Sequence, residues 1–345
     1  MQEWWRPDRF AARRVRLDKR GRILGAIRGF FAARDYVEVD TPALQVSPGL
    51  EPHLRAFKTL LHDPLDGRTA ERYLHTSPEF AMKKLLVAGM PRIWQLAHVF
   101  RDREHGMTHH PEFAMLEWYR VDASYEDLMD ECAALVGICQ DAAGTPALVW
   151  RGETADAQRP WQRLSVADAF QQHCGIDLLA TAPDPLAPDL ERLTAAACHL
   201  GISPHPGDDW EALYFRIFLE RIEPVLGLGT PTILYDYPVS MAALSRRKSS
   251  DPCLAERFEV YVCGLELANA FGELTDPAEQ RRRFVADQAK KRAVYGEIYP
   301  IDGEFLAALD HGLPPCAGIA LGFDRLVMLA TGAEDIEAVL WAPVR

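Results

Sequence analysis

The fold of this chain is decided by residues 92–121, which read RIWQLAHVFRDREHGMTHHPEFAMLEWYRV. Residues 92–100 and 112–121 are rich in aromatic and branched side chains, and a polar, histidine-rich loop separates them. Runs of this composition favour β-strands, and two of them joined by one polar loop predict an antiparallel hairpin. Hairpins without β-α-β alternation favour an α+β fold.

The second strand of this hairpin carries a carboxylate where a buried strand normally has none. Strict alternation places Met115, Glu117 and Tyr119 on one face, and the opposite face is also largely apolar. The strand is therefore expected near the centre of a sheet. Because an unpaired buried charge is costly, Glu117 is expected either to form a structural ion pair or to face a ligand.

Periodicity outside the hairpin predicts the elements that flank it. Apolar residues recur at helical spacing over residues 23–31, and the strand that follows ends at Pro42. A further helix begins after Ser124, which forms a cap pair with Asp127. Residues 141–163 and 180–190 are rich in alanine, proline and polar residues, so the middle of the chain is interpreted as connections and an insertion around a helix.

The C-terminal third resumes regular structure. Asp276 opens a helix, with Pro277 just inside it and Glu279 closing a capping box. Before this helix, strands are predicted at residues 232–238, 258–264 and 265–271. After it, residues 317–332 are predicted to form a strand that runs into a helix.

Composition limits the classes of function. The chain has 345 residues, 48% hydrophobic and 26% charged, which is typical of a soluble globular protein of one or two domains. It has neither the roughly 20 consecutive apolar residues of a membrane helix nor a secretory signal, so the cytoplasm is expected. Seven cysteines without a CxxC pair predict reduced thiols. A net charge of −12 disfavours extended binding to RNA.

Three segments resemble, in order, the signature motifs of class II aminoacyl-tRNA synthetases in the version of lysyl-tRNA synthetase. FRDREHGMTHHPEFAMLEWY resembles motif 2, FFAARDYVEVDTPAL motif 1 and GIALGFDRLVML motif 3. The resemblance implies an antiparallel β-sheet flanked by helices over residues 21–345, preceded by an N-terminal extension over residues 1–20. The implied segments are motif 1 at about 28–44, motif 2 at about 92–120, an insertion at about 141–230 and motif 3 at about 317–331.

The resemblance also implies activation of a carboxylate with ATP. The carboxylate is already an anion, so the protein's task is positioning and charge neutralisation. Arg101 would bridge the carboxylate and the α-phosphate as a planar cation, and Arg325 would hold the γ-phosphate. The implied catalytic residues are Arg101 and Arg325. The implied ATP-binding residues are Arg101, Asp102, Arg103, Glu104, His110, Phe113, Glu266, Leu267, Gly322 and Arg325.

Departures from the family pattern fall in the motif 2 loop. Arg103 stands where a glutamate that contacts adenine is usual, and Glu104 is the candidate replacement. His110 stands where asparagine is usual. The loop histidines do not have the spacing of a zinc site. Without the motif, Arg325 would be interpreted as a surface ion pair with Asp324 or with Glu334.

The resemblance assigns an amino-acid site and a metal site. Substrate-binding residues are Ser77, Pro78, Glu79, Glu117, Tyr119, Asn269, Phe271, Glu273 and Ala320, and the metal ligands are Glu259 and Glu266, which would hold Mg²⁺. Residues 76–79 also match a capping box, which is the alternative role for Glu79. A regular strand places Glu266 on the face opposite Asn269, Phe271 and Glu273, so a bulge or turn near Ala268 is required if all of them line one pocket.

The length of the segment before motif 1 indicates which branch of the family this chain resembles. That segment has only about 20 residues, whereas the barrel that reads the anticodon in lysyl-tRNA synthetase has roughly a hundred, so no anticodon-binding domain is expected. The chain resembles free-standing paralogues that transfer lysine, preferably (R)-β-lysine, to a lysine side chain of elongation factor P. Ala320, where glycine is usual, adds a methyl group that favours the β-amino isomer.

The implied partners are elongation factor P and a second copy of the chain in a homodimer, and tRNA is not expected as a partner. Two alternatives stay open. A stand-alone truncated lysyl-tRNA synthetase would use the basic clusters at residues 246–248, 281–283 and 290–292, which otherwise are solvated surface. A non-catalytic regulatory paralogue has only the altered Arg103 in its favour.

Overall fold

The computed structural model describes residues 3–344, and the chain divides into two compact units. The first unit comprises residues 1–123, 274–328 and 333–345, and the second comprises residues 124–273 and 329–332. Helix α1 (Pro7–Ala32) runs through residue 20 without a break, so most of the predicted extension belongs to a helix. The division into an extension and one catalytic domain stays a prediction.

The sheet of the first unit is built around the predicted hairpin. Its strands lie in the order β1 (Val37–Glu38), β5 (Arg92–Phe100), β6 (Glu112–Val121) and β14 (Cys316–Gly322). Strands β5 and β6 are antiparallel, with Trp94 opposite Trp118, and β14 is antiparallel to β6. The hairpin is thus confirmed. The α+β class is confirmed too, because the described strands of this sheet are antiparallel except where β1 joins β5.

Helices cover this sheet because their apolar faces match it. The buried face of α1 includes Ile23, Ile27 and Phe31, and the Phe31 ring stacks on Trp94 with ring centroids 4.9 Å apart. The other helices of this unit are α2 (Glu79–Val87), α7 (Pro277–Tyr295), α8 (Gly303–Gly312), α9 (Phe323–Thr331), which begins here, and the 3₁₀ turn η6 (Ile336–Val339).

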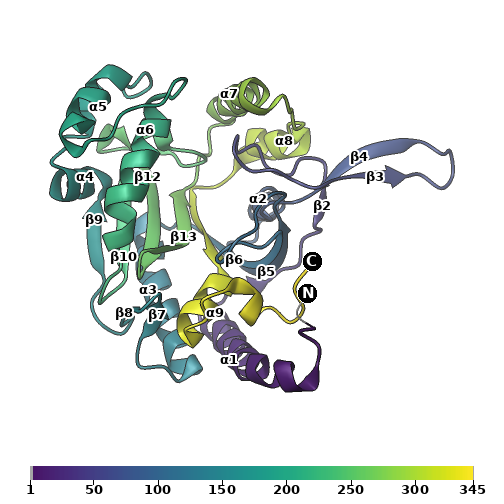
Figure 1. The fold of residues 1–345 in the computed structure, drawn as a ribbon. Coiled ribbons are helices and arrows are strands. Elements are labelled where there is room, and N and C mark those ends of the chain that lie inside the picture. The colour runs from purple at the N-terminus through teal and green to yellow at the C-terminus, as the bar shows by residue number, and fades with distance from the viewer. Residues whose placement is uncertain (1–2, 345) are drawn as a thin grey trace. The chain divides into compact units, whose positions relative to one another are not determined.

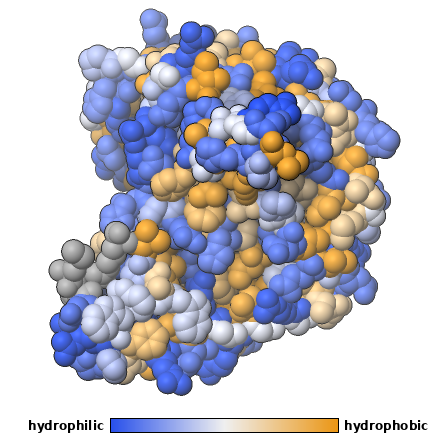
Figure 2. Space-filling view, turned by 90° about the vertical axis from the view of Figure 1, so that its right-hand side faces the viewer, coloured by the Kyte–Doolittle hydropathy of each residue, from blue (hydrophilic) through white to orange (hydrophobic). Residues whose placement is uncertain are grey.

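A second, small sheet in this unit contains β2 (Leu44–Gln45), β4 (Thr69–Leu74) and β3 (Lys58–His62), in that order. Strands β3 and β4 form a ribbon that extends beyond α2 (Figure 1). The ribbon exposes apolar side chains, among them Leu60, Leu61 and Leu65. Seen from that side, the surface shows apolar side chains interspersed with polar ones (Figure 2).

The second unit has its own antiparallel strands, β13 (Leu265–Gly272), β12 (Asp251–Val262) and β10 (Thr232–Pro238), followed by β9 (Gln162–Ser165), which is parallel to β10. Strand β11 (Arg247–Lys248) pairs with β12, and β7 (Leu148–Trp150) pairs with β8 (Glu153–Ala155). The helices are α3 (Tyr125–Ala143), α4 (Val166–Cys174), α5 (Leu190–Ala197) and α6 (Trp210–Ile217). Short helical turns are η1 (Leu179–Thr181), η2 (Cys198–Leu200), η3 (Phe218–Ile222), η4 (Glu223–Val225) and η5 (Val239–Met241).

Much of the predicted insertion forms a helical layer with its own core. Phe170 of α4 and Tyr214 of α6 stack with ring centroids 4.9 Å apart, and both belong to one buried apolar cluster with Tyr261 of β12. Figure 1 shows α4, α5 and α6 beside β9 and β10. Local sequence predicted the helix at residues 166–174 but not the helices that complete this layer.

The predicted helix caps are confirmed in part. Ser124 and Asp127 form a reciprocal capping box at the start of α3. The box predicted for Glu79 is wrong, because the N-cap of α2 is Pro78 and the Glu79 carboxylate pairs with a lysine one turn later. At α7, Asp276 accepts the predicted amide hydrogen bonds, but the Glu279 carboxylate pairs with Arg283 instead of closing the box.

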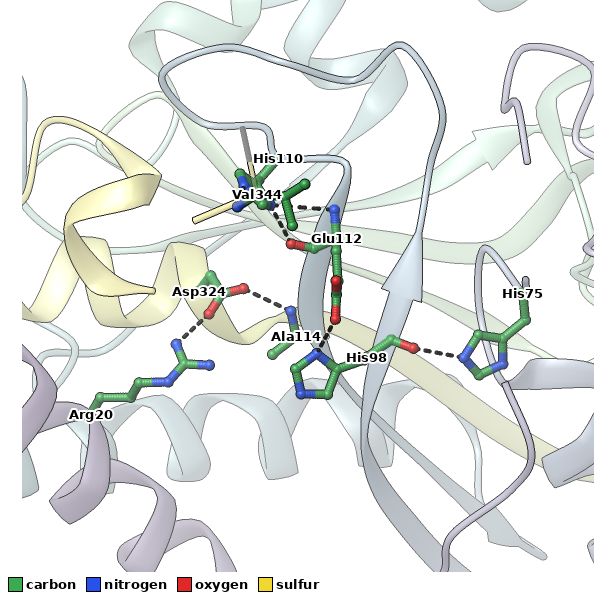
Figure 3. Close-up of polar contacts among 8 residues, drawn as sticks. All are labelled: Arg20, His75, His98, His110, Glu112, Ala114, Asp324 and Val344. Carbon is green, nitrogen blue, oxygen red and sulfur yellow. Dashed lines mark hydrogen bonds and ion pairs between the residues drawn. The ribbon is translucent and has the colours of Figure 1, made fainter. Parts of the chain in front are cut away.

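Asp324 joins three elements of the first unit (Figure 3). Its carboxylate lies at the start of α9, accepts a short hydrogen bond from the Arg20 guanidinium of α1, and accepts the Ala114 amide of β6 at 2.7 Å. Only 1% of the Asp324 surface is exposed. Asp324 therefore pairs with Arg20 and with the backbone of β6.

Replacing Asp324 with alanine leaves the Arg20 guanidinium nearly buried without its carboxylate. We expect D324A to lower the free energy of unfolding by about 3 to 5 kcal/mol, measured by urea denaturation. Asp66 is the matched control, because its ion pair with Arg68 is exposed, and D66A is expected to change the same quantity by less than about 1 kcal/mol. Equal losses in the two variants would contradict the anchoring role of Asp324.

Candidate active site

Arg101 directly follows β5, and its surroundings are those of an anion-binding group. Its amide donates to the Pro111 carbonyl at 2.9 Å, which closes the base of the loop. The guanidinium carbon lies 5.1 Å from the Phe113 ring centroid, and Nη1 lies 3.8 Å from a Glu104 carboxylate oxygen. Within residues 3–344 the buried Nε has no hydrogen-bond partner. A buried donor without an acceptor is costly, so this group is suited to a ligand oxygen.

The loop after Arg101 separates the roles of its charged residues. Arg103 has a positive φ of 65°, and its side chain is 68% exposed. Asp102 donates its amide to the Arg55 carbonyl at 2.8 Å. Glu104, by contrast, is only 25% exposed and faces Arg101. Glu104 is therefore the acidic residue of this loop that lies beside Arg101, and its contact with adenine stays a prediction.

Arg325 reaches the same loop from the first turn of α9. Its Nε donates to the Thr108 carbonyl at 3.3 Å, and its Nη2 donates to His109 Nε2 at 2.9 Å. The three atoms nearest to a Cβ added at Gly322 would all belong to the Arg325 side chain, at 3.5 Å or more. Protein packing therefore does not require glycine at this position, and its role beside a nucleotide stays a prediction.

His109 lies among the charges of this site. Burial lowers its pKa most, the Arg325 and Arg101 cations lower it further, and the Glu104 carboxylate acts in the opposite direction. The neutral ring can then accept the hydrogen bond from Arg325. The sequence reasoning missed this residue, because it considered His109 only as a possible zinc ligand.

His110 is buried and holds the backbone at both of its ring nitrogens (Figure 3). Nε2 accepts the Val344 amide at 3.2 Å, so the proton lies on Nδ1, which donates to the Glu112 carbonyl at 2.5 Å. These bonds stabilise the loop against the C-terminal residues. Contact of His110 with ATP stays a prediction.

The predicted amino-acid residues of the first unit lie together. Ser77 Oγ donates to Glu117 Oε1 at 2.7 Å, and the Tyr119 hydroxyl donates to Glu117 Oε2 at 3.0 Å. Ala320 of β14 lies directly opposite Glu117 in the sheet and so shares its face. Ser77, Pro78 and Glu79 line one small cavity. These residues therefore lie together in the structure, and their contact with an amino acid stays a prediction.

The predicted residues of the second unit lie on one face of β13, because the strand contains the predicted bulge. Ala268 lies opposite Val260, yet Glu266 lies opposite Tyr261, so Leu267 is the extra residue. Beyond the bulge, Asn269 and Phe271 are partly exposed, as is Glu266, between buried neighbours. The Asn269 Oδ1 is buried without a hydrogen-bond partner in residues 3–344.

Glu259, a predicted metal ligand, lies opposite Asn269 but is engaged by protein donors. Its carboxylate accepts from the Tyr237 hydroxyl at 2.6 Å, the Tyr261 hydroxyl at 2.5 Å and Arg257 Nη2 at 2.5 Å. Among the described residues, no group of three or more histidine, cysteine or acidic side chains is arranged to hold a metal ion. Glu259 does not fit a metal ligand in this arrangement.

Comparison with known proteins identifies the class. The family model for tRNA synthetases class II (D, K and N) matches residues 7–344, so the chain belongs to this family. Among residues 3–344, no helix has both the length and the apolar character needed to cross a bilayer.

The chain is similar over nearly its whole length to proteins named elongation factor P--(R)-beta-lysine ligase. The Vibrio cholerae protein is 42% identical over 95% of this chain and 94% of its own length. The Vibrio parahaemolyticus protein is 39% identical over 99% of each chain. The Proteus mirabilis protein is 39% identical over 99% of this chain and 97% of its own.

The charges around His109 predict its titration. We expect its pKa to lie below the ordinary 6.5, and we expect R325Q to raise it, because one cation beside the ring is removed. NMR titration of the ring protons measures both values. His75 is the internal control, since burial lowers its pKa without a contribution from Arg325, and R325Q should leave it unchanged. A wild-type pKa of His109 at or above 6.5 would refute the arrangement.

Proposed function

We propose that this chain activates (R)-β-lysine, or lysine, with ATP as an aminoacyl-adenylate and transfers it to a lysine side chain of elongation factor P. The proposal is carried by identity of about 40% over almost the whole chain to ligases of that name. The buried, unpartnered Nε of Arg101 supports the activation step independently, because it offers a donor to an anion.

The first step joins two anions, so its barrier is largely electrostatic. A substrate carboxylate oxygen attacks the α-phosphorus of ATP, the new O–P bond forms, and pyrophosphate leaves with the electrons of the broken P–O bond. Arg101 would hold the carboxylate and the α-phosphate together as a planar fork that stays protonated. Arg325 would neutralise the γ-phosphate end of the departing pyrophosphate, and His109 would orient the Arg325 guanidinium.

The second step transfers the acyl group. The acceptor amine, after losing its proton, attacks the carbonyl carbon of the mixed anhydride. The C–N bond forms and AMP leaves with the electrons of the C–O bond. The acceptor ammonium loses two protons in all, one before the attack and one as the amide forms, and solvent takes up both.

Recognition of the amino acid is proposed for two groups of residues. Ser77, Glu79, Glu117, Tyr119 and Ala320 belong to the first unit. Asn269, Phe271 and Glu273 belong to the second, where Glu273 would receive the terminal ammonium. The methyl group of Ala320, on the same face as Glu117, favours the β-amino isomer by about 1 to 3 kcal/mol at most.

Further partners follow from this chemistry. Mg²⁺ is expected to accompany ATP mainly through the phosphates, with Glu266 as its proposed carboxylate ligand, and Glu259 is engaged by its three donors. We propose a homodimer, as the family resemblance implies. The net charge of −12 argues against tRNA as the acceptor. A ligase that modifies a translation factor works where ribosomes do, so we propose the cytoplasm.

Activation is tested by exchange of labelled pyrophosphate into ATP with (R)-β-lysine. We expect R101A to reduce kcat/KM by about 100-fold or more, because a charge-stabilising donor of the transition state is lost. R72A is the matched control, since Arg72 lies on the exposed ribbon, and its activity should equal that of the wild type. Near-normal exchange by R101A would mean that the reaction centre lies elsewhere.

The acceptor is tested separately, by adding elongation factor P or tRNA to the enzyme together with ATP and (R)-β-lysine. We expect the mass of elongation factor P to rise by one lysyl group and tRNA to stay unlabelled. Labelled tRNA with unmodified factor would indicate a truncated lysyl-tRNA synthetase. Absence of exchange with every lysine isomer would indicate a regulatory paralogue.

A further inference from the structure

A small cavity lies where residues 45–51 meet the start of α2, and it contains polar atoms that lack partners. Ser47, Glu51, Ser77 and Glu79 are among its lining residues. Within residues 3–344, Ser47 Oγ and Glu51 Oε2 are both buried without a hydrogen-bond partner, and Ser47 is only 3% exposed. The cavity volume of about 10 Å³ is close to that of one water-sized group.

The fold holds Glu51 in this position. Lys291 of α7 is 1% exposed, and its Nζ donates to the carbonyls of Glu51, Pro52 and Leu54, at 3.4 and 3.1 Å for the first two. Gly49 has φ +120°, and a Cβ there would lie 2.6 Å from Glu51 Oε2. The carboxylate thus packs over a position that only glycine allows.

The charges around the cavity favour a cation. Glu79 has Lys83 as its ion-pair partner, whereas Glu51 forms no ion pair among the described residues. Burial raises the pKa of Glu51 most, and the Glu79 carboxylate raises it further, while Arg101 and Lys291 act in the opposite direction. A small ligand with a positive charge and several N–H donors would stabilise both carboxylates and satisfy Ser47.

We propose that Glu51, with Ser47, binds the substrate ammonium group that lies nearest the substrate carboxylate. This inference rests on the proposed function. Lysine and β-lysine carry two ammonium groups, and the terminal one is assigned to Glu273. The other ammonium is only one or two carbons from the carboxylate, which Arg101 would hold. The Arg101 cation also acts on Glu51, because it lowers the pKa of that carboxyl group. An ammonium head has the size of the cavity and three donors to offer.

The test compares two ligands that differ in this ammonium alone. 6-Aminohexanoate keeps the carboxylate and the terminal ammonium of β-lysine but lacks the ammonium near the carboxylate. Calorimetry on the full chain gives both dissociation constants. We expect E51Q to weaken (R)-β-lysine about tenfold or more, as for a lost hydrogen bond to a charged group, and to leave 6-aminohexanoate within about twofold. S47A should weaken β-lysine in the same direction by less.

Glu71 provides the control, because it lies on the exposed ribbon and E71Q should leave both constants unchanged. Equal weakening of the two ligands by E51Q would overturn the inference and assign Glu51 a structural role. Unchanged binding of both would overturn it as well, with water as the occupant of the cavity. If wild-type protein binds 6-aminohexanoate and β-lysine equally and activates neither, the proposed function fails together with the inference.

Discussion

The first unit depends on one buried carboxylate, that of Asp324. It accepts from Arg20 of α1 and from the Ala114 amide of β6, two segments that are far apart in the sequence. Because Arg325 is the next residue on α9, the bonds that fix Asp324 also direct the Arg325 side chain toward Thr108 and His109. The stability of the first unit and the position of Arg325 therefore depend on the same carboxylate. Loss of either hydrogen bond to Asp324 is expected to affect both properties.

The candidate residues of each unit include polar atoms that the protein itself does not satisfy. Arg101 Nε and Glu51 Oε2 in the first unit, and Asn269 Oδ1 in the second, are buried without partners among the described residues. Such atoms cost free energy in the unliganded chain, and a ligand of opposite polarity recovers it. Within the first unit, Lys291 donates to backbone carbonyls at residues 51–54, and within the second, the bulge at Leu267 sets the face of β13 on which Asn269 lies.

Sequence patterns succeeded where the deciding interactions are local. The hairpin followed from composition, and the capping box of α3 followed from residues three positions apart. The bulge followed from a conflict between the pleat and the residues implied by the family. The same local reasoning failed at Glu79 and Glu279, because each carboxylate has a basic residue one helical turn later that competes with the backbone amide for it.

By itself the sequence determined the antiparallel hairpin and the family, because these are properties of short contiguous segments. Only the tertiary structure decided that His109 contacts Arg325, that Glu259 accepts from three donors, and that Glu51 lines a small cavity. The physical reason is the distance along the chain. Lys291 holds a carbonyl 240 residues away, and no local periodicity specifies a partner at such a separation.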